Sequence, residues 1–109
     1  MSDATITSYT LVDFPTESDL IAFFVFVENN YDKLASDLRA NGMTKFYVTR
    51  VFNKEGKFTV GNWLEYSSQA SYAACDKVWQ TFMSEVYSDK VNFIVKVAPY
   101  RGIVQYDYS

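Results

Sequence analysis

Apolar side chains recur at steps of three and four residues from Leu20 to Leu38, with polar residues between them. The recurring positions are Leu20, Phe23, Phe24, Val27, Tyr31, Leu34 and Leu38. This spacing gathers them on one side of an α-helix. Thr16 is a suitable N-cap with Asp19 three residues on, and Asn41-Gly42 is a suitable left-handed stop. The pattern therefore predicts a helix of about 24 residues.

A second, shorter helix is predicted after Ser67 or Ser68, either of which can cap it. Its apolar stripe consists of Tyr72, Cys75, Val78, Trp79, Phe82 and Val86. Alternating β-prone segments fill the rest of the chain. They cover residues 5–14, 43–52, 57–66 and 89–100, and 102–108 continues the last strand or forms a short fifth one. The "NKEG" segment at 53–56 predicts a hairpin turn, and Pro15 and Pro99 are expected to end strands.

The resulting order is β-α-β-β-α-β, which predicts one α+β domain over residues 1–109 with the ferredoxin-like fold. This fold is a four-stranded antiparallel sheet with both helices on one face. In a monomer such a sheet needs only one apolar face, but here both faces of the predicted strands carry apolar and aromatic residues. The face turned away from the helices is therefore expected to be an interaction surface.

Composition removes several classes of function. The chain has no histidine, one cysteine and scattered glycines, so we expect no metal site, no bound cofactor, no histidine-dependent nucleophile and no glycine-rich phosphate loop. Its net charge of −3 disfavours nucleic acid as a partner. The apolar run 20–27 is too short to cross a membrane, and no secretion signal is recognisable, so a cytoplasmic location is expected.

That apolar run also raises a question of packing. Ile21, Val25 and Phe26 lie off the predicted helix stripe, in a segment with no charge and no hydrogen-bonding side chain. Burying a large apolar side chain stabilises a protein by about 1.5–3 kcal/mol. We therefore expect all three to be covered, by the core, a cavity or a neighbouring molecule.

Asn62, Trp63 and Tyr66 belong to the densest polar and aromatic cluster of the sequence. Asn62 and Tyr66 share one strand face and can act as catalytic groups that orient a carbonyl or phenolate, or stabilise an oxyanion, in a pocket between sheet and helices. The alternative is structural, with Trp63 in a dimer face and Tyr66 in the core. Arg50 is a third catalytic candidate, because it can hold a ligand carboxylate; alternatively it pairs with Glu65 on the next strand.

Ligand contacts are expected from five aromatic residues, with core packing as the alternative. They are Trp63, Tyr72, Trp79, Phe26 and Tyr47. Tyr72 and Trp79 are seven residues apart and so share a helix face. Cys75 between them is expected to be a small buried apolar group. Tyr100 and Arg101 either rim the pocket or contact a neighbouring subunit.

The segment "FTVGNWLEYSSQASYAAC" at 58–75 resembles the strand-then-helix segment of the dimeric α/β-barrel superfamily, which includes antibiotic-biosynthesis monooxygenases and stress-responsive barrel proteins. The resemblance implies a homodimer with two sheets packed face to face and a C-terminal segment that reaches the partner. In the monooxygenases Asn, Trp and Tyr line the pocket, and the aromatic substrate activates oxygen without a cofactor. In the monooxygenases a histidine often follows on the helix of this segment. Here Cys75 lies near that position, so the resemblance does not imply histidine-dependent chemistry.

Two functions remain open at this stage. The first is a small-molecule-binding or cofactor-independent monooxygenase-like protein that acts on a hydrophobic aromatic compound. The second is a non-catalytic homodimeric interaction module. A defined cavity that Asn62, Tyr66 or Arg50 enters would favour the first, whereas a pocket filled by Phe23, Phe26, Trp79 and Phe82 would favour the second.

Overall fold

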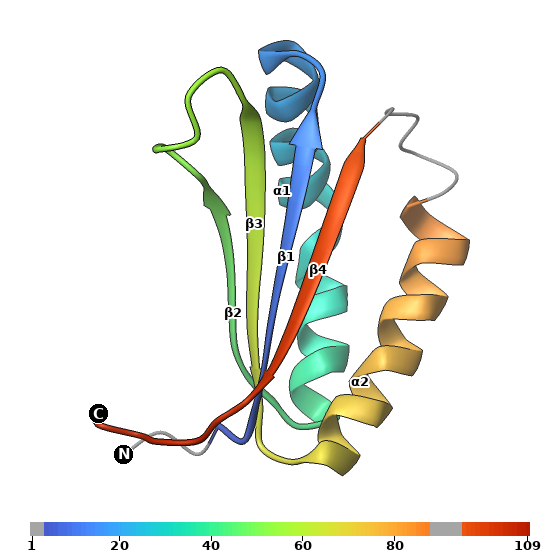
Figure 1. The fold of residues 1–109 in the computed structure, drawn as a ribbon. Helices are drawn as coiled ribbons and strands as arrows, with labels where there is room; N and C mark the ends of the chain where they lie inside the picture. The colour runs from blue at the N-terminus through green and yellow to red at the C-terminus, as the bar shows by residue number, and fades with distance from the viewer. Residues whose placement is uncertain (1–3, 88–94) are drawn as a thin grey trace.

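A computed structural model describes residues 4–87 and 95–109 (Figure 1). Its elements are β1 (Ile6–Phe14), α1 (Glu17–Ala40), β2 (Met43–Arg50), β3 (Phe58–Tyr66), α2 (Gln69–Phe82), the π-helical turn η1 (Met83–Tyr87) and β4 (Lys96–Ile103). The strands form one antiparallel sheet in the order β2-β3-β1-β4. Both helices lie behind this sheet in Figure 1. The predicted ferredoxin-like α+β fold is confirmed.

Helix α1 begins and ends where the capping residues predict. The Thr16 hydroxyl accepts a hydrogen bond from the backbone N–H of Asp19 at 3.1 Å. At the other end Gly42 has φ 102°, a left-handed conformation that is unfavourable for residues other than glycine. The helix spans 24 residues, as expected.

Helix α2 is capped by Ser68, whose hydroxyl accepts from the Ser71 N–H at 3.0 Å. Cys75 is fully buried and its thiol lies 3.4 Å from the Leu38 carbonyl oxygen, to which it donates. Burial raises the pKa of this thiol. Cys75 therefore helps to pack α2 against the end of α1.

Aromatic rings fill much of the core between the sheet and the helices. Tyr31 of α1 is at the centre of this cluster and lies edge-on to several rings. Its centroid distances are 6.4 Å to Phe23, 6.2 Å to Phe26, 6.2 Å to Trp79 and 5.5 Å to Phe82. Burial raises the pKa of the Tyr31 phenol well above its usual value.

The fourth strand differs from its prediction. It was expected over 89–100 and closed by Pro99, but β4 covers Lys96–Ile103 with Pro99 inside it, paired in register with Thr10. Residues 88–94 lie outside the described residues. Because β4 is an outer strand paired to β1 alone, a residue without an N–H is tolerated there. Residues 104–109 form no fifth strand.

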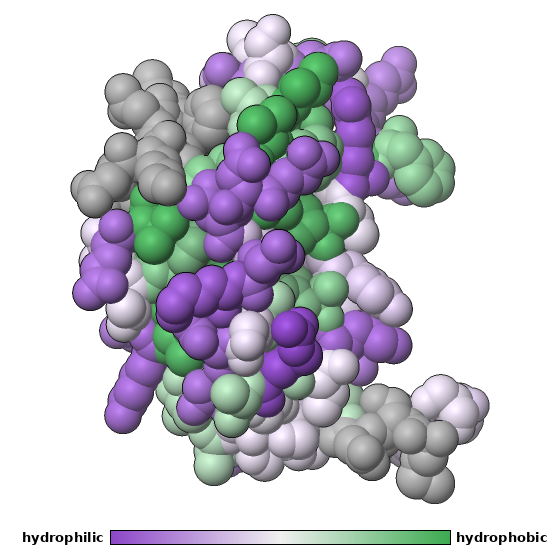
Figure 2. All heavy atoms as spheres, turned by 180° about the vertical axis from the view of Figure 1, so that it is seen from behind, coloured by the Kyte–Doolittle hydropathy of each residue, from purple (hydrophilic) through white to green (hydrophobic). Residues whose placement is uncertain are grey.

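Two other expectations about apolar residues are wrong for the single chain. Ile21 and Val25 are 50% and 51% exposed on α1, while Phe26 alone of that trio is buried. The second strand was expected over 43–52, but β2 ends at Arg50. Phe52 therefore lies in the β2–β3 connection and is 96% exposed. Figure 2, which views the side where the helices lie, shows apolar groups interspersed among hydrophilic ones. In the described residues no helix is long and apolar enough to span a bilayer.

Candidate functional site

A cavity of about 330 Å³ opens between the helix-facing side of the sheet and α2. It is lined by Ser8, Thr10, Val12, Phe23, Tyr31, Asn62, Leu64, Tyr66, Tyr72, Asp76, Trp79, Met83, Tyr87, Val97, Pro99 and Arg101. Strands β1, β3 and β4 form one wall, and α1, α2 and η1 supply the other side chains. Four residues predicted to be catalytic or to contact a ligand meet here, namely Asn62, Tyr66, Tyr72 and Trp79, and Arg101 lies in the same lining.

Asn62 gives this cavity its most informative polar atom. The residue lies on β3 opposite Thr10 of β1 and is only 9% exposed. Its carbonyl oxygen Oδ1 is the one buried side-chain nitrogen or oxygen atom without a hydrogen-bond partner among the described residues. Leaving a buried acceptor unpaired costs about 1–3 kcal/mol, so such an atom needs an explanation.

Tyr66 and Tyr72 form the end of the cavity next to the β3–α2 connection. Their rings meet edge to face with centroids 5.3 Å apart. Tyr66 is only 2% exposed, and burial raises the pKa of its phenol to about 12. The phenol is therefore protonated at neutral pH and can donate a hydrogen bond.

Arg101 of β4 reaches across to α2, where its Nε donates to the Tyr72 hydroxyl at 2.7 Å. The guanidinium is exposed, and so this contact lies at the rim of the cavity. Within the described lining, Arg101 is the one basic residue and Asp76 the one acidic residue. The Asp76 carboxylate accepts from Gln80 Nε2 at 2.7 Å.

The sequence did not identify Ser8, Thr10 and Arg101 as a group. Strand alternation puts Ser8 and Thr10 on the same face as Val12, but only the pairing of β1 with β3 and β4 brings them to Asn62 and Arg101. The expectation that Pro99 ends the strand separated Arg101 from the sheet. Arg101 follows Pro99 by two residues, so a strand that continues through Pro99 puts both on the same face. This spacing was the available signal for Arg101.

Trp63 and Tyr47 do not line this cavity, because they lie on the opposite face of the sheet. There the register aligns four aromatic residues, one from each strand, in the order Tyr47, Trp63, Tyr9 and Tyr100. Tyr9 and Trp63 form an edge-to-face pair with centroids 5.6 Å apart. Trp63 Nε1 donates to the Glu65 carboxylate at 2.8 Å. We call these four residues the aromatic row.

Arg50 and Phe26 also lie outside the cavity lining. The expected pairing of Arg50 with Glu65 is wrong, since Arg50 Nη2 contacts Glu17 Oε2 at 3.3 Å, at the start of α1. Both partners are substantially exposed, so this ion pair adds little stability. Phe26 packs in the core against Phe82 and Tyr87, with centroids 6.0 and 5.5 Å away.

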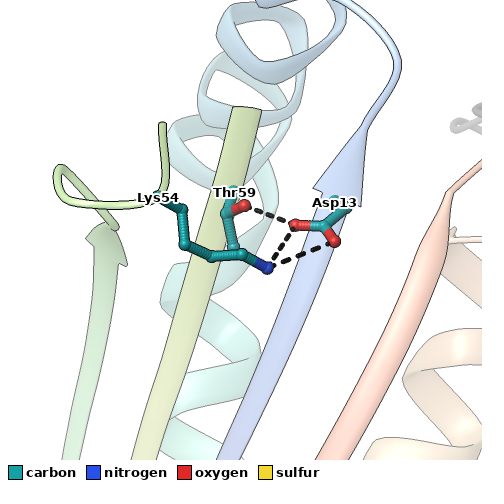
Figure 3. A network of polar contacts seen from close by, with 3 residues as sticks. All are labelled: Asp13, Lys54 and Thr59. Carbon is teal, nitrogen blue, oxygen red and sulfur yellow. Dashed lines mark hydrogen bonds and ion pairs between the residues drawn. The ribbon is translucent and has the colours of Figure 1, made fainter. Parts of the chain in front are cut away.

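A polar cluster on the open face of the sheet joins Asp13, Thr59 and Lys54 (Figure 3). Thr59 donates to the Asp13 carboxylate, and Lys54 Nζ lies 3.3 and 3.4 Å from its two oxygens. The Thr59 hydrogen bond is the main reason that the pKa of Asp13 is lowered. Lys54 lowers this pKa further, whereas partial burial of the carboxylate raises it. Every polar group drawn there has a partner, so the cluster's role is to hold the β2–β3 turn against β1.

A wider groove of about 790 Å³ lies between α1, α2 and η1. Its rim includes Lys33 and Asp37, which form an ion pair at 2.7 Å on the helix surface. The described residues contain no group of three histidine, cysteine, aspartate or glutamate side chains close enough to hold a metal ion.

Of the cavity and the wider groove, the cavity between the sheet and α2 is the better candidate site, because it contains the unpaired Asn62 oxygen.

Comparison with known proteins bears on both the family and the fold. A family model described as "Domain of unknown function (DUF6974)" matches residues 3–104. Among curated proteins none matches the sequence.

Two crystal structures of dimeric ferredoxin-like proteins from an uncultured marine organism are similar to this chain. One has a TM-score of 0.87 and 23% identity, over 96% of this chain and 98% of the other. The second has a TM-score of 0.83 and 24% identity, over 95% and 98%. A monooxygenase from Streptomyces coelicolor, in complex with nanaomycin D, has a TM-score of 0.69 and 9% identity, over 98% and 93%. The likeness to ferredoxin-like dimers and monooxygenase folds expected from the sequence is confirmed at the level of the fold.

Proposed function

This chain belongs to the DUF6974 family, and we propose that it is a homodimeric protein that binds a hydroxylated aromatic small molecule between its sheet and helices. The observation that carries the proposal is the unpaired Oδ1 of Asn62 inside the cavity. A ligand hydroxyl that donates to this oxygen would offset the cost of burying it. An amide oxygen accepts and does not donate, so the ligand must bring the proton.

The cavity walls favour a flat ring system as the body of the ligand. Its aromatic side chains include Tyr66, Tyr72, Trp79 and Phe23. A volume of about 330 Å³ is within the range of small-molecule sites, where a few polar groups orient a largely apolar ligand. The non-catalytic alternative requires a filled pocket with no polar group turned inward, and it leaves Asn62 without an explanation.

The homodimer is proposed from the aromatic row on the other face of the sheet. Tyr47 and Tyr100 are more than half exposed, on a face where apolar groups come from all four strands. An exposed patch of this kind typically marks an interface. Two similar proteins are described as dimeric, and a second copy of this chain is the partner that fits.

The chemistry proposed for the bound compound is oxidation by molecular oxygen without a cofactor. A cyclic ketone with a ring methylene opposite its carbonyl is a suitable substrate, because its enol form is a hydroxylated aromatic compound. The methylene takes up one oxygen atom of O₂ to become a carbonyl, and the other oxygen leaves as water with the two hydrogens. Asn62 would hold the enol O–H, and the neutral Tyr66 phenol would donate to the developing enolate. The similar fold of a monooxygenase supports this reading.

Binding is tested by calorimetric titration with 2-naphthol and with 2-methoxynaphthalene, which cannot donate a hydrogen bond. We expect the naphthol to bind about tenfold more tightly, since one hydrogen bond to a buried acceptor is worth about 1–1.5 kcal/mol. The Asn62→Leu variant should remove this preference and leave the affinity for the methyl ether within about twofold. Equal affinities of the wild type for both compounds would refute the proposal.

Oxidation is tested with anthrone by following oxygen uptake and the absorbance of anthraquinone. One molecule of O₂ should be consumed for each anthraquinone formed. Tyr66→Phe should lower the catalysed rate about a hundredfold, as expected for the loss of one hydrogen-bond donor to the developing enolate, worth about 2.7 kcal/mol. Tyr106→Phe, which changes an exposed tail residue, is the matched control. A rate equal to that in buffer would refute the oxygenase reading and leave the binding result to stand by itself.

A further inference from the structure

Arg101 brings a positive charge to the cavity that no acidic side chain neutralises directly. Its Nε hydrogen bond goes to a neutral phenol, Tyr72, and none of the ion pairs within the described residues includes Arg101. Asp76, the acidic residue of the lining, is engaged by Gln80 on its own helix. The rim of the cavity at β4 therefore carries a cation that belongs to no ion pair within the described residues.

The Tyr72 contact also orients the guanidinium. Because Nε is used, the Nη1 and Nη2 groups are left on the far side of the planar fork, where two parallel N–H donors match the two oxygens of a carboxylate. Tyr72 is thus a positioning residue for Arg101.

Register sets the distance between this cation and Asn62. Arg101 pairs with Ser8, whereas Asn62 pairs with Thr10, so the two residues flank β1 and are offset by two positions. With strands about 4.8 Å apart and a rise of about 3.4 Å per residue, their Cα atoms are about 12 Å apart. Both side chains line the same cavity, which leaves room between them for a fused ring system.

We propose that the ligand is an aromatic anion, with a hydroxyl at one end on Asn62 Oδ1 and a carboxylate at the other end on Arg101. This inference rests on the proposed function, and it specifies the ligand class. The charged end belongs at Arg101, the one basic residue of the described lining, and not at Asp76, the one acidic residue, which repels a carboxylate.

The probes are 6-hydroxy-2-naphthoic acid, its methyl ester and 2-naphthol, titrated by calorimetry at low salt and pH 7.5. The wild type should bind the acid about fivefold more tightly than the ester, the range expected for a partly exposed charge pair. Arg101→Gln should abolish this difference and bring the ratio of acid to ester affinity to about one. Arg101→Lys should retain part of the preference, because the charge is kept and the planar fork is lost.

Arg39→Gln is the matched control, since it removes the same charge from the exposed end of α1. It should leave the ratio of acid to ester affinity unchanged. Urea unfolding of each variant confirms that it is folded before it is titrated. Raising the salt concentration should reduce the preference for the acid and leave the ester unaffected.

The outcomes separate this inference from the proposed function. Equal binding of acid and ester by the wild type, with the naphthol still bound, overturns the anionic ligand and keeps the cavity as a hydroxyaryl site. A preference for the acid that survives Arg101→Gln overturns the assignment to Arg101. Failure to bind any of the three compounds overturns both proposals.

Discussion

Gly61 allows a direct test of how tightly the aromatic row is packed. The residue lies on β3 opposite Leu11 and Thr49, on the face that carries the row. A Cβ atom at this position would lie 2.7 Å from Tyr9 Oη, 2.8 Å from Tyr9 Cε1 and 2.9 Å from Thr49 Oγ1. These distances are well inside normal contact of about 3.5–4 Å. Glycine is thus present because the Tyr9 ring crosses the backbone of the neighbouring strand.

Gly61→Ala should destabilise the protein by about 1 kcal/mol. Tyr9 must turn away and weaken its edge-to-face pair with Trp63, which is worth about 1 kcal/mol. Thr49 must give up its 3.0 Å hydrogen bond to the Gly61 carbonyl, at a further cost of about 1 kcal/mol. Replacing glycine in a strand by alanine returns about 0.5–1 kcal/mol.

A double-mutant cycle with Tyr9→Val measures the part that depends on the ring. Valine suits a strand and leaves space above residue 61, so Gly61→Ala should then be nearly neutral. Urea unfolding followed by tryptophan fluorescence, at one fixed protomer concentration, gives the four free energies of unfolding. The coupling should be about 1 kcal/mol. Equal effects of Gly61→Ala in the two backgrounds, within about 0.5 kcal/mol, would refute the packing argument.

Two further predictions concern pH. Burial raises the pKa of Tyr66 to about 12 from a usual value of 10.0, so the unfolded chain loses this proton first and stability should fall between about pH 10 and about pH 12. Tyr66→Phe should make this fall smaller when it is followed as the urea midpoint at each pH. An unchanged fall would contradict the assignment to Tyr66. Because the Thr59 hydrogen bond lowers the pKa of Asp13 below 3.8, its stabilisation is present above that pH and is lost as the pH drops through the folded-state value. Thermal melts from about pH 5 to about pH 2 should show a smaller acid-dependent decrease for Asp13→Asn than for the wild type, and equal decreases would contradict this.

The helices and the central strands could be predicted because their signals are local. Thr16 and Gly42 set the ends of α1 without help from the rest of the fold, and the hairpin turn at 53–56 fixes how β2 meets β3. The bounds of β4 could not be predicted from local sequence signals. Pro99 ends a strand in most contexts, and its acceptance here depends on β4 having a partner on one side only.

For the candidate site, alternation along β3 was enough to place Asn62 and Tyr66 together. The same alternation puts Trp63 on the other face, so the sequence already argued against a pocket shared by Asn62 and Trp63. Arg101 was left between the rim of the pocket and a neighbouring subunit, because its approach to Asn62 depends on the pairing of strands that are far apart in the chain. Nothing local distinguished Phe26, which is buried, from Val25, which is exposed.

The proline in β4 also limits how copies of this protein can associate. An outer strand normally offers a row of backbone donors that can extend the sheet into another molecule, which is a route to aggregation. Pro99 removes one donor from that row, and the charged residues Lys96 and Arg101 flank it in the same strand. The β4 edge is therefore a poor template for a continuous intermolecular sheet. The proposed dimer across the aromatic row would instead close on itself, so association would stop at two copies.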